Sequence, residues 1–112
     1  MKLIRAIIQP HRLEMVRDAL QAKGVTGMTA YQAQGFGRQK GHKEIYRGAE
    51  YQTHFLPKLT LEIAVGAERV DAICEVIMKT ARTGNIGDGK IFVVELGKVI
   101  RIRTGETNES AL

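Results

Sequence analysis

Alternating apolar and polar positions predict the strands of this chain. Between residues 59 and 65 every second residue is Leu, Ile or Val, and the residues between them are Thr, Glu and Ala. This period of two is typical of a strand with one buried face. Shorter apolar runs bounded by Gly or Pro predict further strands at 3–8, 27–35, 91–96 and 99–103.

Two segments repeat their apolar residues every three or four positions, which predicts amphipathic helices. The first runs from His11 to Lys23 and is ended by Gly24. The second spans 70–81 and has the strongest helical period in the chain. Its apolar residues are Val70, Ile73, Cys74, Ile77, Met78 and Ala81.

The order of these segments is βαβ–βαβ with a short final strand. In a chain of 112 residues it indicates one domain, 1–112, with a ferredoxin-like α+β sandwich of βαββαβ order. Two helices would cover one face of an antiparallel sheet. The other face carries apolar residues with no helix to cover it, so we expect self-association. We expect 104–112 to be a loose tail.

The stretch from Gly35 to Tyr51 shows neither strand alternation nor a helical stripe. It is long for a connection in a small domain, where loops usually have about 4–6 residues. Its side chains include the basic or potentially cationic Arg38, Lys40, His42, Lys43 and Arg47. Two interpretations stay open: a solvated hairpin tip, or a mobile arm that contacts a ligand or a partner.

Composition narrows the class of protein. The net charge of +5 indicates an anionic partner, which could be phosphate, nucleic acid, an acidic protein or a membrane surface. No apolar run reaches the roughly 18 residues of a membrane span, and Arg5 interrupts the N-terminal run, so we expect no signal peptide. The single Cys74 excludes an internal disulfide and is typical of a reducing cytoplasm.

A glycine-rich segment from Gly84 to Lys90 has the G-x-x-x-x-G-K spacing of a P-loop. Ile91 stands where a P-loop needs a hydroxyl residue, and a strand follows instead of a helix, so we exclude a P-loop NTPase. Backbone N–H groups and Lys90 can still bind phosphate, which we favour over an ordinary glycine turn. The stretch 35–41 misses the dinucleotide fingerprint because its third glycine comes one residue late.

Other candidate groups are less specific. Arg101 and Arg103 would project from one strand face about 7 Å apart, which suits either a polyphosphate or a solvated edge. Glu62 lies opposite the apolar residues of its strand and could accept a hydrogen bond from a ligand amine or hydroxyl, or be a plain surface carboxylate. Cys74 reads as a packed thiol. The histidines lack metal-ligand spacing, and no catalytic arrangement is recognisable.

Four motifs carry a resemblance to a known family. They are Gly-Phe-Gly-Arg-Gln-Lys-Gly-His (35–42), Tyr-Arg-Gly-Ala-Glu-Tyr (46–51), Ala-Arg-Thr-Gly-Asn-Ile-Gly-Asp-Gly-Lys-Ile-Phe (81–92) and Val-Ile-Arg-Ile-Arg-Thr-Gly-Glu (99–106). Over its whole length the chain resembles the nitrogen regulatory PII signal proteins. Departures are few: Ala49 excludes the serine phosphorylation of some members, and Asn85 stands where Lys is common.

The resemblance implies a non-enzymatic homotrimer that binds ATP or ADP in each of three clefts between subunits. Arg101 and Arg103 would come from the neighbouring subunit, and Thr29, Glu62 and Ala64 would hold the adenosine. The full set of implied nucleotide-binding residues is Thr29, Gly35, Gly37, Arg38, Gln39, Glu62, Ala64, Gly87, Asp88, Gly89, Lys90, Arg101 and Arg103.

The resemblance also implies 2-oxoglutarate as a second effector, bound with Mg-ATP at the base of the arm. Gln39 would help to ligate Mg²⁺ and Lys58 would pair with a carboxylate. The implied set is Gln39, Lys40, Gly41, Lys58 and Gly87. The arm would be the family's T-loop, at about 37–55, with a second glycine loop at about 82–90 and a C-terminal loop at about 102–112.

The arm's conformation would then report the ligand state to partners. Tyr51 matches the family's uridylylated tyrosine, and Arg47 matches the residue that plugs an ammonia channel. The implied partners are a uridylyltransferase, a nitrogen-control kinase or adenylyltransferase, and an ammonium channel that would recruit this cytoplasmic protein to the inner membrane. We expect no direct binding of nucleic acid.

Two other classes of protein agree less well with the sequence. An RNA-binding module of this fold needs exposed aromatics on its central strands, and residues 59–65 contain none. A nucleotide-hydrolysing enzyme needs a placed base and a hydroxyl ligand for Mg²⁺, and neither is recognisable in the sequence.

Overall fold

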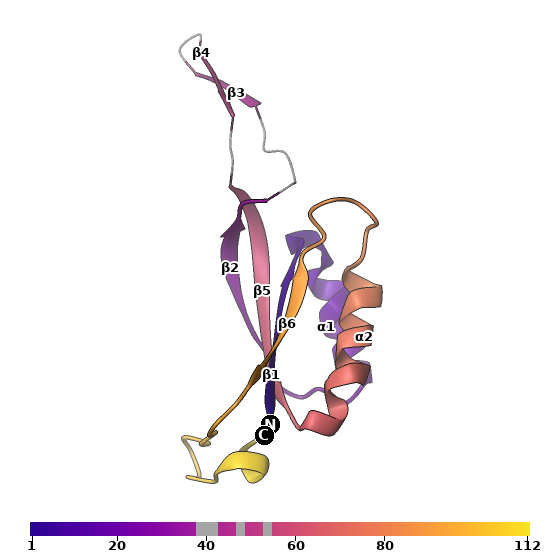
Figure 1. Cartoon of the computed structure of the whole chain (residues 1–112), viewed down its shortest axis with the longest axis vertical. Coiled ribbons are helices and arrows are strands. Elements are labelled where there is room, and N and C mark those ends of the chain that lie inside the picture. The colour runs from indigo at the N-terminus through magenta and orange to yellow at the C-terminus, as the bar shows by residue number, and fades with distance from the viewer. Residues whose placement is uncertain (38–42, 47–48, 53–54) are drawn as a thin grey trace.

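The computed structural model describes residues 1–37, 43–46, 49–52 and 55–112, with side chains in 1–37 and 55–112 (Figure 1). Within these ranges an antiparallel sheet has the strand order β2-β5-β1-β6. Its strands are β1 (Lys2–Ile8), β2 (Thr29–Gly35), β5 (Leu56–Val65) and β6 (Lys90–Glu95). Helices α1 (Leu13–Ala22) and α2 (Val70–Ala81) each follow a short 3₁₀ turn, at Pro10–Arg12 and Ala67–Arg69. The order of these elements confirms the predicted ferredoxin-like α+β fold.

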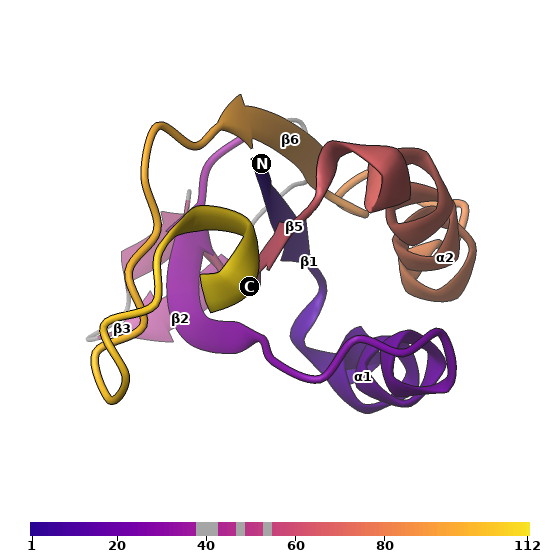
Figure 2. The same ribbon diagram turned by 90° about the horizontal axis from the view of Figure 1, so that it is seen from below.

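The core lies between the sheet and the two helices, which sit together on one side of it (Figure 2). Alternation buries Ile4, Ala6 and Ile8 in β1 and Leu61, Ile63 and Val65 in β5, while the helical stripes supply the facing layer. The largest fully buried side chains are Ile4, Ile8, Val16, Leu20, Leu61, Ile63, Ile73 and Ile77. Burying each contributes about 1.5–3 kcal/mol relative to exposure, so these two patterns determine the fold.

Helix α1 ends at Ala22, and the predicted stop residue Gly24 follows it with a φ of +84°, in the left-handed region that favours glycine. The N–H of Gly24 donates to the Gln21 carbonyl, and the N–H of Val25 donates to the Leu20 carbonyl. Val25 is itself buried. The end of the helix is therefore closed by hydrogen bonds and packed against the core.

The second face of the sheet, here called the open face, is not covered by a helix in the described part of the chain. It carries Arg5 of β1 and Glu62 of β5, which are paired in register. It also exposes the apolar or aromatic side chains of Tyr31, Phe92 and Val94, each more than two-fifths exposed. The expected uncovered apolar face is present, and self-association through it stays a prediction.

The absence of any strand pattern between Gly35 and Tyr51 was misleading. Backbone strands β3 (Lys43–Tyr46) and β4 (Ala49–Gln52) form an antiparallel pair. This hairpin projects beyond the end of the main sheet (Figure 1). In the described ranges β3 and β4 pair only with each other. The pair lies outside the four-stranded sheet whose register on the core imposes an alternating sequence.

The predicted strand at 99–103 is wrong. The chain turns back there instead: the Arg101 N–H donates to the Glu106 carbonyl at 2.9 Å, and the Gly105 N–H donates to the Arg101 carbonyl at 2.8 Å. The strand-like pairing in this segment is limited to one isolated antiparallel bridge between Ile100 and Thr107. Arg101 and Arg103 therefore do not share a strand face, as the alternation suggested.

The C-terminal segment is also not a loose tail. A 3₁₀ turn forms at Asn108–Ala111, and the Asn108 N–H donates to the Val99 carbonyl at 2.7 Å. The Asn108 side-chain carbonyl in turn accepts from the Val99 N–H at 3.2 Å. Because these contacts join polar groups, apolar periodicity could not reveal them.

Strand β5 begins at Leu56, earlier than the predicted Leu59, so that Pro57 lies inside it. Strand β1 pairs with β5 only from Leu59 onward. The start of β5 is thus an edge on that side, where proline is tolerated. No helix in the described ranges is long and apolar enough to cross a bilayer.

Candidate functional site

The predicted binding residues that the structure describes gather at two ends of the sheet. The arm-end cluster consists of Gly35, Gly37, Lys58 and the loop 87–90, close to the base of the β3–β4 hairpin (Figure 1). The tail-end cluster consists of Thr29, Glu62, Ala64 and Arg101, which line one cleft. Arg103 belongs to neither and is exposed in the turn after Arg101.

Lys58 is the most buried charged side chain of the arm-end cluster, with only 7 % of it exposed. Its Nζ donates a hydrogen bond of 2.6 Å to the Gly87 carbonyl. The stem passes Gly35, where an added Cβ would lie 3.1 Å from the Lys58 Cγ. Burial lowers the pKa of Lys58, while the nearby charge of Asp88 raises it. The result is a desolvated amine at the arm's base, suited to an anionic ligand.

The glycine loop is shaped by its backbone. Gly87 and Gly89 have φ values of +104° and +100°, which other residues rarely adopt. A Cβ at Gly89 would lie 1.7 Å from the Ile7 carbonyl oxygen, so the loop is pressed directly against β1. Lys90 follows at the start of β6, exposed and paired in register with Ile7. The Lys90 ammonium therefore lies next in sequence to glycine residues whose backbone has no side chains to shield it.

Asp88 holds the loop together from within. Its carboxylate accepts hydrogen bonds from the Thr83 and Gly84 N–H groups, each at 2.9 Å, and from the Thr83 hydroxyl. The hydroxyl contact is the largest cause of the lowered pKa of Asp88, and the two N–H groups act in the same direction. In this structure the carboxylate therefore stabilises the loop's shape, a role that the sequence did not reveal.

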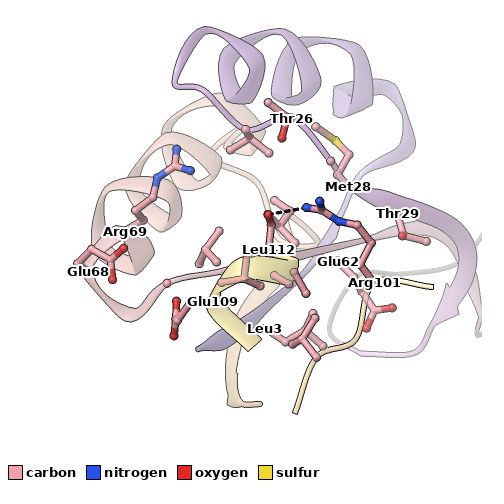
Figure 3. A pocket seen from close by; sticks show the side chains of 18 residues that line it. Leu3, Thr26, Met28, Thr29, Glu62, Glu68, Arg69, Arg101, Glu109 and Leu112 are labelled. Atoms are coloured by element: carbon pink, nitrogen blue, oxygen red, sulfur yellow. Dashed lines mark hydrogen bonds between the residues drawn. The ribbon is translucent and has the colours of Figure 1, made fainter. Parts of the chain in front are cut away.

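The tail-end cluster lines a cleft of about 870 Å³ (Figure 3). Thr29 and Glu62 are paired in register on adjacent strands, and Ala64 follows on the same face of β5. Met28, Val25 and Leu3 add apolar surface. A concave surface that is part apolar, with a few polar groups, suits a flat organic ring.

The cleft is partly lined by the chain's own C-terminus, including Glu109, Ala111 and Leu112. The Arg101 guanidinium donates to the Glu106 carboxylate at 3.1 Å. It also donates to the Leu112 carbonyl at 3.2 Å (Figure 3). All three side chains are at least partly exposed. The C-terminal segment thus accepts hydrogen bonds from the Arg101 guanidinium, and these contacts are accessible to solvent.

Sequence reasoning missed Arg5, which supports the tail-end cluster from the neighbouring strand. Its Nε and Nη2 both donate to Oε2 of Glu62, at 3.0 and 2.8 Å. These hydrogen bonds, more than any other cause, raise the pKa of Arg5, and Tyr31 adds to the effect. The alternation of β1 could have revealed Arg5, because it places Arg5 on the face opposite Ile4 and Ala6.

Several predicted residues lie outside the described residues: Arg38, Gln39, Lys40, Gly41 and Arg47. The backbone of Tyr51 belongs to β4, but its side chain is not described. Where side chains are described, no group of His, Cys, Asp or Glu could hold a metal ion. Cys74 packs against the core, and burial is the largest cause of its raised pKa.

The two clusters lie at separate positions along β5. Lys58 and Glu62 are four residues apart, which is about 13 Å in a strand. One chain therefore presents two partial sites.

Comparison with known proteins covers the whole chain. The family model described as nitrogen regulatory protein P-II matches residues 1–106. The chain is 60% identical to the nitrogen regulatory protein P-II of Pasteurella multocida (strain Pm70) over 112 residues, which is all of both chains. Over the same full lengths it is 54% identical to the nitrogen regulatory protein GlnK and 56% identical to the nitrogen regulatory protein P-II 1, both of Escherichia coli (strain K12).

Proposed function

The chain belongs to the nitrogen regulatory P-II family of non-enzymatic signal transducers, and from this premise we propose that it is a homotrimer sensing ATP, ADP and 2-oxoglutarate. The effectors would bind in three clefts between subunits. Two observations support this arrangement: the partial sites at opposite ends of one sheet, and the open face that carries Tyr31, Phe92 and Val94. Association through that face would bury these side chains and bring the arm-end cluster of one subunit to the tail-end cluster of the next.

In the assembled cleft, the tail-end cluster would hold the adenosine. Thr29 and Glu62 supply a hydroxyl and a carboxylate, and Ala64 leaves room for the ring. The phosphates would lie on the arm-end cluster of the neighbouring subunit, beside its glycines and its basic side chains. The residues proposed for the phosphates are Gly35, Gly37, Arg38, Gln39, Gly87, Asp88, Gly89 and Lys90, with Arg101 and Arg103 from the subunit that holds the adenosine.

2-Oxoglutarate would bind at the base of the arm beside Mg-ATP. Lys58 is the residue that carries this proposal, because a desolvated ammonium beside the Gly87 carbonyl is a strong partner for a carboxylate. Gln39, Lys40 and Gly41 would complete the site. Mg²⁺, which the phosphates would largely hold with Gln39, supplies charge neutralisation to the triphosphate.

The arm would transmit the ligand state to partners. A ligand in contact with residues at the arm's base shifts the arm's equilibrium only by its differential affinity for the arm's conformations. Uridylylation of Tyr51 would add negative charge near cationic residues and change which partners bind. We propose a uridylyltransferase, a nitrogen-control kinase or adenylyltransferase, and an ammonium channel contacted by Arg47 as partners, with the protein cytoplasmic until the channel recruits it to the inner membrane.

The observation that carries the function is the buried Lys58 amine between the arm base and the glycine loop. The test is calorimetry of 2-oxoglutarate binding with and without saturating Mg-ATP, on protein whose mass in solution is measured by light scattering. We expect a trimer, and 2-oxoglutarate binding at least tenfold tighter when Mg-ATP is present. A monomer, or no heat of 2-oxoglutarate binding with Mg-ATP, would overturn the proposal.

A further inference from the structure

The pair formed by Arg5 and Glu62 carries an inference that rests on the proposed nucleotide site and deepens it. Glu62 lines the tail-end cleft, whereas Arg5 does not. The Nε and Nη2 groups of Arg5 both donate to the same oxygen, Oε2, at 3.0 and 2.8 Å. In the described part of the chain Oε1 receives no hydrogen bond. One carboxylate oxygen is therefore anchored by the neighbouring strand, and the other remains able to accept from a ligand.

This geometry is fixed by the register of the sheet. Arg5 and Glu62 face each other across β1 and β5, and Thr29 faces Glu62 from the other side, across β2. The Glu62 side chain is 23% exposed and that of Arg5 is 42% exposed. The guanidinium fork is planar and restricts the carboxylate to few orientations. A carboxylate held in this way enters the cleft with a defined direction.

The chemistry of the pair selects a kind of ligand group. An ionised carboxylate only accepts hydrogen bonds. The 6-amino group of adenine donates, whereas the 6-oxo group of hypoxanthine or guanine only accepts. An acceptor opposite an acceptor is left unpaired, and a site built to pair a polar group rejects the ligand that lacks the matching partner.

We infer that Arg5 is a positioning and specificity-determining residue of the nucleotide site, which holds the Glu62 carboxylate as an obligate acceptor and so selects 6-amino purines over 6-oxo purines. It acts through Glu62 and does not itself contact the base. Tyr31 lies beside Arg5 and supports its charge. Glu62 is the charged residue among the three proposed for adenosine, so selectivity for the base depends on it.

The test compares binding of ATP and inosine triphosphate, which differ at the purine 6-position and at the ring nitrogen beside it. Wild-type protein is expected to prefer ATP by at least 100-fold. Arg5→Leu should weaken ATP binding about tenfold and reduce the preference for ATP over inosine triphosphate about tenfold, because the Glu62 carboxylate is then free to turn. Arg5→Lys, which keeps the charge without the fork, should retain an intermediate preference.

A double-variant cycle separates positioning from a structural effect. In the Glu62→Gln background, Arg5→Leu should leave the ATP-to-ITP ratio unchanged, because the residue through which Arg5 acts is gone. The matched control is Arg17→Leu, which removes an arginine paired with Glu14 on the exposed face of α1 and should change neither ratio nor affinity. Mass in solution is measured for every variant.

The outcomes distinguish this inference from the proposed function. If wild-type protein binds ATP but Arg5→Leu and Arg5→Lys both keep the wild-type ratio, the inference is overturned and the proposed function stands. An Arg5→Leu effect of equal size in the Glu62→Gln background also overturns it. Wild-type protein that binds neither ATP nor ADP overturns both proposals. If Arg5→Leu does not assemble, the Arg5→Lys and Glu62→Gln ratios decide the question.

Discussion

The arm-end and tail-end clusters lie on the same sheet but are built in different ways. The arm-end cluster is fixed by backbone geometry, with Gly89 pressed against Ile7 and Asp88 holding two N–H groups of its own loop. The tail-end cleft is lined in part by exposed side chains, with Arg101 held by Glu106 and the Leu112 carbonyl. Backbone packing admits few alternatives, whereas exposed charge pairs contribute little and are readily exchanged.

This difference suggests a division of work. A site for an anion benefits from a rigid cradle, because its donors then need no reorganisation when the ligand arrives. A cleft that admits a large ligand benefits from side-chain contacts that the ligand can replace when it binds. In the proposed trimer, each cleft would combine one rigid half with one exchangeable half. The predictions below test that contrast.

Gly89→Ala should have the largest effect. The new Cβ would lie 1.7 Å from the Ile7 carbonyl oxygen at a φ of +100°, so β1 or the loop must move. We expect a loss of roughly 3–5 kcal/mol in the free energy of unfolding, measured by urea titration. Gly97→Ala is the matched control, because an added Cβ there meets nothing within 4 Å. Equal stability of the two variants would contradict a rigid arm-end cluster.

Lys58→Met should have the second-largest effect, and this effect is on ligand binding. The variant keeps the stem but removes the ammonium, and we expect 2-oxoglutarate affinity to fall about 30-fold in calorimetry, which corresponds to about 2 kcal/mol. Lys79→Met on the exposed face of α2 is the control. Unchanged affinity in the Lys58 variant would show that the ligand's carboxylate binds elsewhere.

The lowered pKa of Lys58 adds a dependence on pH. The native amine releases its proton below the ordinary value of 10.5, so carboxylate binding should weaken at a pH where an ordinary lysine is still charged. The unfolded chain binds more protons in that window, so stability gains from this residue as pH rises from the native pKa toward 10.5. Lys58→Met should lack that rise. Identical alkaline profiles would contradict the burial of a charged amine.

Asp88→Asn should have a smaller effect, of about 1 kcal/mol in unfolding free energy at neutral pH, because the residue is partly exposed but its carboxylate accepts three hydrogen bonds. The native pKa of Asp88 is lowered below 3.8. Its stabilising effect is therefore present above that value and lost as pH falls through the native pKa. Urea titrations should show the wild-type advantage disappearing in acid, whereas Asp18→Asn on α1 should show none at neutral pH.

Glu106→Gln should have the smallest effect. Arg101 and Glu106 are both partly exposed, so the loss in stability should stay below about 1 kcal/mol. Removing the competing carboxylate should free Arg101 for phosphate and tighten ATP binding about twofold to threefold. Weaker ATP binding in this variant would show that Glu106 orients Arg101 for the ligand instead of competing with it.

The sequence predicted those parts of the fold in which a core imposes a period. The apolar positions in 70–81 correspond to α2 (Val70–Ala81), because a helix that buries one stripe must repeat its apolar residues. The β3–β4 hairpin and the C-terminal turn escaped prediction for the opposite reason: backbone pairing and polar contacts hold them. Alternation alone even suggested a strand at 99–103, where Gly105 and the backbone bonds of Arg101 make a turn.

The candidate site was predictable to a similar degree. Glycines and cations marked the loop before Lys90, and Glu62 was recognisable by its position opposite the apolar face of its strand. The contact of Lys58 with Gly87 and that of Arg5 with Glu62 join residues 29 and 57 positions apart. Such contacts follow from strand register, which a single sequence does not give. The ligands and the residues from 38 to 41 stay predictions from family resemblance.

The position of the two termini has a practical consequence for fluorescent reporters. Both ends of the chain lie together at the end of the molecule opposite the β3–β4 hairpin (Figure 1), with the Met1 amine 3.9 Å from Glu109. A fluorophore fused to either end would therefore sit beside the Arg101 cleft and far from the hairpin. Its signal would follow occupancy of the cleft more directly than the conformation of the arm of the same chain. A sensor of the arm needs its label within the arm itself.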